Sequence, residues 1–155
     1  MKKLKLLIWA AVLIIADISL SKYISIFRAA PMLTYAFAVC VALMEEKFVI
    51  AAVTGGLCGI ILGAYDSYSF ELMFMFYAFS AVLTNRLFGT KQYGAFRAAL
   101  ICAAAVAVMK LVLYAFFHSD VTFGGLTKYL VPPAVYCASA AAVLHPIIKN
   151  TVYKN

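Results

Sequence analysis

Two ionisable side chains, Asp17 and Lys110, lie deep inside apolar stretches of the sequence. A charged group at such a depth is costly in lipid and is read by default as functional. Both lie toward the same end of their stretches, so an ion pair between them is one hypothesis. The alternative is that each side chain reaches the nearby membrane surface, with the long stem of Lys110 passing Tyr114. We prefer this second interpretation.

Other polar residues offer little catalytic chemistry. Asp66 and Glu71 could together bind a cation or act as acid and base, but Asp66 is better explained as a turn former or helix cap and Glu71 by its favourable charge at a helix start. His118 and His145 are expected at opposite membrane faces and therefore cannot share a metal. No activating partner lies near the serines Ser67, Ser69, Ser119 and Ser139. We expect no enzyme activity, no metal and no cofactor.

The four cysteines also give no metal or redox motif. They lack Cys-x-x-Cys spacing and a neighbouring histidine, and all fall inside apolar stretches, at Cys40, Cys58, Cys102 and Cys137. We interpret them as small apolar packing residues.

The composition indicates what must position these residues. Of 155 residues, 66% are hydrophobic and 12% are charged, whereas an ordinary soluble domain has roughly half and a quarter. We therefore predict an integral membrane protein. The net charge of +7 does not indicate nucleic acid, because the basic residues form no patch on a soluble module.

The apolar runs predict an all-α, polytopic membrane bundle, with residues 1–155 forming one membrane domain. Six transmembrane helices are expected, at about 4–21, 29–44, 48–65, 70–88, 98–117 and 129–148. The first run could instead be a signal peptide, but it is longer than usual and no clean cleavage site follows. The second run, which Pro31 opens, is short and is expected to begin earlier, to tilt or to be shielded.

Small residues recur every four positions in two of these spans. Gly55, Gly59 and Gly63 form a stripe that leads to Asp66, and an alanine row lies at Ala99, Ala103 and Ala107. Residues four apart share one helix face, so each stripe allows a neighbouring helix to approach closely. The alternative is that glycine is simply common in membrane helices. We predict the tightest helix contact along the glycine stripe.

Basic residues set the expected orientation. Nine lysines and arginines lie on the side of the N-terminus and three on the other side, with Lys110 inside a span. Positive residues concentrate in the cytoplasm, so both termini are predicted to be cytoplasmic.

Two segments of the sequence carry a family resemblance. The first is the run Gly55-Gly-Leu-Cys-Gly-Ile-Ile-Leu-Gly-Ala-Tyr-Asp66, which follows the span opened by Pro31. The second is Val131-Pro-Pro-Ala-Val-Tyr-Cys-Ala-Ser-Ala-Ala-Ala-Val-Leu-His-Pro-Ile-Ile-Lys149. Together they resemble the MreD family of bacterial rod shape-determining proteins, and the second is similar to that family's last span. Cys137 and Ala142 depart from the Asn and Pro that the family often has there.

The resemblance implies a non-catalytic scaffold of the cell-elongation machinery. Such a protein lies in the bacterial inner membrane, binds the single-span protein MreC and links MreB filaments to the peptidoglycan polymerase and transpeptidase. A partner helix is then expected to dock on the glycine and alanine faces, whose residues are Gly55, Gly59, Gly63, Asp66, Ala99, Ala103 and Ala107. The family also resembles, in fold, the substrate-binding subunits of energy-coupling-factor vitamin transporters, which supplies an alternative function. A ligand would then be enclosed near Asp66 and the 121–128 loop, with Phe74, Tyr77, Lys110 and Asp17 as supporting residues.

Overall fold

The computed structural model describes residues 2–21, 23, 32–64, 70–89, 94–117 and 123–153. The described residues contain six α-helices and no strand, which confirms the all-α prediction. The helices are α1 (Lys2–Ser21), α2 (Leu33–Met44), α3 (Phe48–Gly63), α4 (Phe70–Phe88), α5 (Ala95–Phe117) and α6 (Phe123–Ile148). A short π-helical segment, η1 (Lys149–Tyr153), continues α6.

The largest departure from the expected boundaries is the start of α6. This helix begins at Phe123, so Gly124 lies in its first turn instead of in a loop. It then runs through Pro132, Pro133 and Pro146. Each proline lacks the N–H that would bond the carbonyl four residues earlier, and α6 nevertheless continues for 26 residues.

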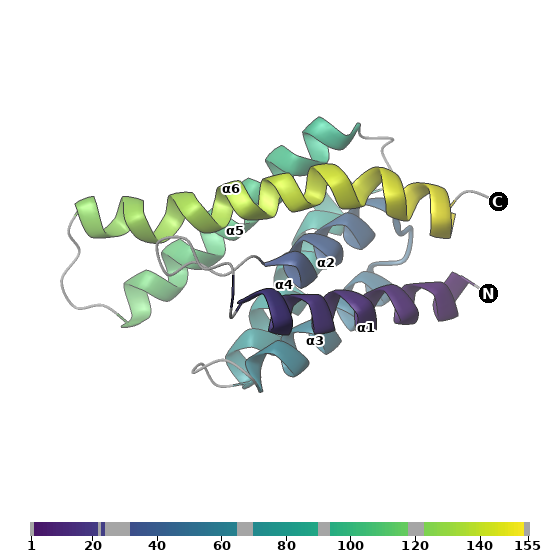
Figure 1. Ribbon diagram of the computed structural model, residues 1–155, viewed down its shortest axis with the longest axis horizontal. Coiled ribbons are helices and arrows are strands. Elements are labelled where there is room, and N and C mark those ends of the chain that lie inside the picture. Colours follow the sequence, from purple (N-terminus) through teal and green to yellow (C-terminus); the bar gives the residue numbers. More distant parts are fainter. Residues whose placement is uncertain are drawn as a thin grey trace.

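Helix α2 lies at the centre of the bundle (Figure 1) and contacts each of the other five helices. Every residue from Thr34 to Leu43 is buried. The sequence of α2 is apolar on all sides and carries no charged residue, which is typical of a helix enclosed by others. With 12 residues it is about 18 Å long, shorter than the roughly 30 Å hydrocarbon core of a bilayer. Shielding by protein, one of the expected explanations for its shortness, is what the structure shows.

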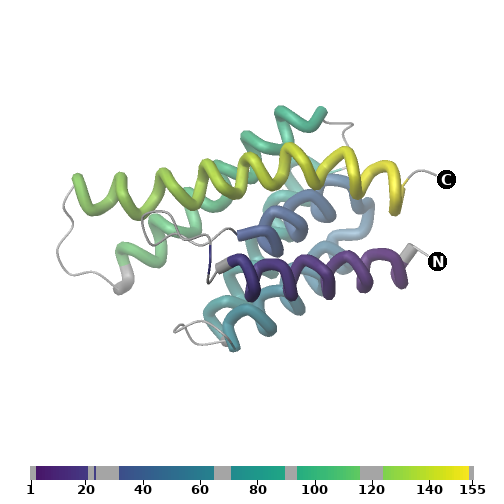
Figure 2. The backbone as a smooth tube through the Cα atoms, in the orientation of Figure 1, coloured from purple at the N-terminus to yellow at the C-terminus, as the bar shows by residue number. Residues whose placement is uncertain are grey.

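The two chain ends lie at the same end of the bundle (Figure 2). Lys5 on α1 donates a hydrogen bond from Nζ to the carbonyl of Thr151 on η1, at 3.0 Å. At this end α4 also finishes and α3 begins, because Asn85 on α4 and Tyr153 on η1 both bond Glu45, which lies just before α3. The guanidinium of Arg86 lies 4.4 Å from the centre of the Phe48 ring. We call this the terminal end of the bundle.

Within the described residues, two segments are long and apolar enough to cross a membrane: Ala95–Ala115 in α5 and Gly124–Tyr153 in α6 and η1. Helices α2 and α3 have only 12 and 16 residues. Helix length therefore supports a membrane location for two segments, and the six-span arrangement stays a prediction.

Candidate functional site

A carboxylate from α1 binds the start of the buried helix α2. Asp17 accepts hydrogen bonds from the backbone N–H of Leu33 (2.8 Å), the backbone N–H of Thr34 (2.7 Å) and the Thr34 hydroxyl. The N-cap residue Met32 provides no side-chain hydrogen bond of its own. The first N–H groups of a helix lack intrahelical partners and carry partial positive charge. Asp17 therefore acts as the N-cap of α2 from a different helix.

This placement corrects both expectations for Asp17. Its side chain is 4% exposed, so it does not reach the membrane surface, and its bonds go to α2 instead of to Lys110. Lys110 lies with Nζ 5.2 Å from the centre of the Tyr129 ring, between α5 and α6. The start of a buried helix offers backbone donors, and these compete with any lysine for the carboxylate.

A second polar cluster binds the other end of α2. Asn85 on α4 donates from Nδ2 to the carbonyls of Ala42 (2.8 Å) and Glu45 (2.6 Å). The hydroxyl of Tyr153 on η1 donates to Oε2 of Glu45 at 3.0 Å. Glu45 and Asn85 are only 5% and 8% exposed. The last carbonyls of a helix need donors, and Asn85 supplies two.

The two clusters have one chemical effect in common. At each end of α2, side chains from other helices satisfy backbone groups that the helix cannot satisfy itself. Buried polar groups of this kind are costly when left unpaired. The clusters therefore fix the position of α2 along its own axis relative to α1, α4 and η1.

The glycine stripe of α3 lies against α4. A Cβ atom added at Gly55 would stand 2.7 Å from the carbonyl oxygen of Tyr77, and one at Gly59 would stand 2.5 Å from that of Met73. Gly63, the third member of the stripe, is buried. The glycines thus permit backbone-to-backbone contact between α3 and α4, the most extensively packed pair of helices. This glycine face is filled within the chain.

The alanine row of α5 is not the buried face of that helix. Ala99, Ala103 and Ala107 are half-buried, whereas the fully buried residues lie one position earlier, at Ala98, Cys102 and Val106. Small residues occupy nearly every side of α5 in this region, so their spacing could not identify the buried side. The alanine row remains partly accessible.

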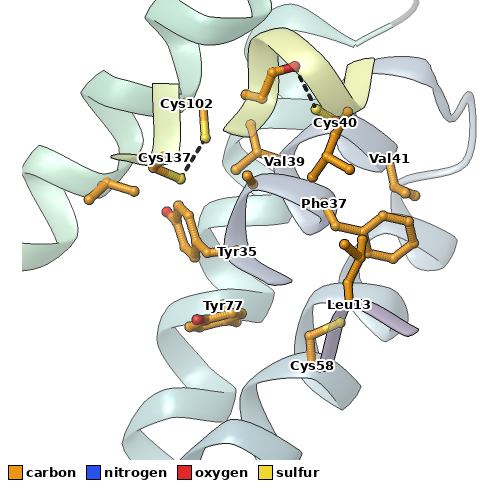
Figure 3. Packing of buried hydrophobic residues seen from close by; sticks show 14 of the residues in the cluster. Leu13, Tyr35, Phe37, Val39, Cys40, Val41, Cys58, Tyr77, Cys102 and Cys137 are labelled. Carbon is orange, nitrogen blue, oxygen red and sulfur yellow. Dashed lines mark hydrogen bonds between the residues drawn. The ribbon is translucent and has the colours of Figure 1, made fainter. Parts of the chain in front are cut away.

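Several residues of the transporter hypothesis have packing contacts. Phe74 covers Gly56, where an added Cβ would stand 2.6 Å from its ring. Tyr77 is buried and lies edge-on to Tyr35, with ring centres 4.9 Å apart (Figure 3). Asp66 lies outside the described residues, together with Ser67, Ser69 and His118.

The cysteines pack inside the bundle, and all four are buried and unbridged. Figure 3 shows Cys102 on α5 facing Cys137 on α6, with 2.9 Å between the sulfur atoms. Cys40 donates a weak hydrogen bond to the Ala141 carbonyl at 3.9 Å. Within the described segments, no three residues of metal-ligating type come together.

A pocket of about 510 Å³ opens at the terminal end of the bundle, between the start of α5 and the end of α6. Its lining residues are Gly94, Ala95, His145, Pro146, Lys149, Asn150 and Tyr153. The sequence analysis assigned neither His145 nor Lys149 to a binding site. The sequence feature that could have indicated this pocket is His145, which is followed by Pro146 and, four residues after the histidine, by Lys149.

Comparison with known proteins finds no matching family model, no matching curated protein and no matching solved structure. The resemblance to MreD is therefore carried by the two sequence segments described above.

Proposed function

We propose that this chain is a non-catalytic membrane scaffold of the cell-elongation machinery, which binds an MreC-like single-span protein. Through that partner it would help couple MreB filaments to peptidoglycan synthesis outside the membrane. The observation that carries the proposal is the use of three buried polar side chains. Asp17 and Asn85 bond backbone groups at the two ends of α2, and Glu45, the residue that follows α2, accepts a hydrogen bond from Tyr153 on η1. The interior is thus built to hold a fixed shape.

Exposed apolar side chains support the membrane location. Large hydrophobic residues project from the outer faces of five helices, and examples are Leu7, Ile15, Val53, Met75, Phe79, Leu100 and Val135, each more than half exposed. Soluble monomers rarely expose apolar surface on this scale, whereas lipid covers it without cost. Only α2, which is enclosed by protein, lacks such a face.

The surface that we propose for the partner helix is the alanine row of α5. Because α4 already fills the glycine face of α3, a partner cannot use that face without separating α3 from α4. Ala99, Ala103 and Ala107 are partly accessible and small enough for the close approach on which helix association in lipid depends.

The charges at the terminal end of the bundle support an orientation of the protein in the membrane. Lys5, Lys47, Arg86 and Lys149 belong to the helix ends that meet there. We propose that this end faces the cytoplasm, because basic residues are retained on that side.

Depletion of the protein in its bacterial host tests the proposal. A scaffold of elongation predicts that rod or oval cells become round while their vitamin requirements stay unchanged. Normal cell shape together with a new vitamin requirement would overturn the scaffold and favour the transporter subunit.

A further inference from the structure

The pocket at the terminal end has walls from two helix ends. Gly94 and Ala95 belong to the start of α5, and the opposite wall is formed by the end of α6 together with η1. Its volume of about 510 Å³ falls in the range of small-molecule sites. None of the helix-end contacts described above for α2 requires this space.

His145 is the residue that points to a ligand. It lines the pocket and its residue as a whole is only 5% exposed. Within the described part of the chain its imidazole makes no hydrogen bond, and its ring nitrogens are not among the enclosed polar atoms, so they remain open to the pocket. Buried polar side chains normally have a partner. An imidazole that faces a cavity can obtain one from a bound molecule.

The charges around the pocket favour an anion. Lys149 contributes an exposed ammonium group, and Asn150 contributes an amide. The first N–H groups of α5 point back toward Gly94, and of these the N–H of Ala98 is bonded to the Gly94 carbonyl at 3.1 Å. The N–H groups of Ala95, Phe96 and Arg97 precede it and have no intrahelical partner. A helix start of this kind attracts phosphate.

Among the described residues that line the pocket, none carries a carboxylate. Glu45 stands behind Tyr153, whose hydroxyl donates to it. The carboxylate of Glu45 is therefore engaged in the contact at the end of α2.

We propose that this pocket binds a phosphate group, with Lys149 and His145 as hydrogen-bond donors and the start of α5 as the third partner. The phosphate can belong to the headgroup of an anionic phospholipid or to a free phosphate compound. Phe96, 75% exposed in the first turn of α5, would then lie beside the acyl chains of a lipid. The inference concerns a ligand of the bundle itself and does not depend on a protein partner.

Native mass spectrometry of the full-length protein in detergent tests this site. The protein is titrated with phosphatidylglycerol, with zwitterionic phosphatidylcholine and with inorganic phosphate. Replacing Lys149→Gln is expected to weaken binding of the phosphate-bearing ligand about tenfold, the loss of one charge-assisted hydrogen bond. The control Lys47→Gln removes an exposed charge at the same end and is expected to change affinity less than twofold.

A second variant tests the cavity without altering charge. A side chain at Gly94 meets no atom within 4 Å of its Cβ, so Gly94→Phe can occupy the mouth of the pocket while the fold is retained. It is expected to weaken binding as much as Lys149→Gln does.

The ligands distinguish the two phosphate sources. Selective binding of phosphatidylglycerol over phosphatidylcholine assigns the site to lipid, and binding of inorganic phosphate without lipid selectivity assigns it to a free phosphate compound. The proposal is overturned if the wild type binds neither, or if Lys149→Gln and Gly94→Phe both bind as Lys47→Gln does.

Discussion

Replacing Asp17→Ala tests the cap that α1 supplies to the central helix. The substitution removes the acceptor for the N–H groups of Leu33 and Thr34 and for the Thr34 hydroxyl. All three donors lie in a region where Asp17 and Thr34 are almost fully buried, so water cannot easily replace the carboxylate. The result should be a large loss of stability instead of a local change.

The magnitude follows from the bonds lost. Loss of an N-cap costs about 1 kcal/mol, and a buried donor left without its charged partner costs about 1–3 kcal/mol. With partial relaxation, we expect about 3 kcal/mol for Asp17→Ala. For a chain of 155 residues this corresponds to a melting temperature lower by about 6–12 °C.

Thermal unfolding of the purified protein in detergent measures this loss. The control is Ser19→Ala, which changes an exposed polar residue in the same helix and is expected to shift the melting temperature by about 1 °C or less. Thr34→Val removes the hydroxyl donor and should destabilise less in the Asp17→Ala background than in the wild type. Equal melting temperatures for Asp17→Ala and Ser19→Ala, or full additivity with Thr34→Val, would refute the capping role.

Three further predictions concern helix packing. Gly59→Ala places a Cβ 2.5 Å from a carbonyl oxygen of α4 and should lower the free energy of unfolding by about 2 kcal/mol. Gly94→Ala places its Cβ in open space and should leave the stability nearly unchanged. Identical thermal unfolding of the two variants would contradict the α3–α4 contact. Asn85→Ala removes the donor to the carbonyls of Ala42 and Glu45 at the end of α2. It should lower the free energy of unfolding by about 2 kcal/mol in the same assay. An unchanged melting temperature would argue against this role of Asn85. Copper(II) phenanthroline should oxidise the thiols of Cys102 and Cys137, whose sulfurs are 2.9 Å apart, to a disulfide within one chain, with the two electrons passing to the copper reagent. If both thiols can still be alkylated after this treatment and denaturation, α5 and α6 are not paired as described.

The helices themselves were largely predictable from sequence. The boundaries of α3 and α4 could be predicted to within two residues from the apolar runs. The reason is that Glu45-Glu46-Lys47 and the residues after Gly63 interrupt the apolar pattern. The start of α6 was missed because Gly124 suggested a loop, although glycine in a first turn disturbs little of the helix.

The arrangement of the helices was much less predictable. In a membrane, positions that face lipid and positions that face protein are both apolar, so the central helix α2 and the outer helix α3 look alike in sequence. For the same reason the alanine spacing of α5 did not reveal that Ala98 and Cys102 form the buried side.

The polar contacts were missed for a different reason. The partners of Asp17 are mostly backbone N–H groups, and those of Asn85 are backbone carbonyls. Every residue carries these groups, so sequence offers no pattern that identifies them. Their availability depends on where a buried helix begins and ends in three dimensions.

Co-purification with an MreC-like single-span protein from native membranes tests the scaffold most directly. The wild type and the Ala104→Leu control, which changes an exposed residue of α5, are predicted to retain the partner. Ala103→Leu is predicted to lose most of it while its amount in the membrane and its melting temperature match those of the control. Absence of the partner from the wild-type preparation, or equal recovery with Ala103→Leu, would contradict the account.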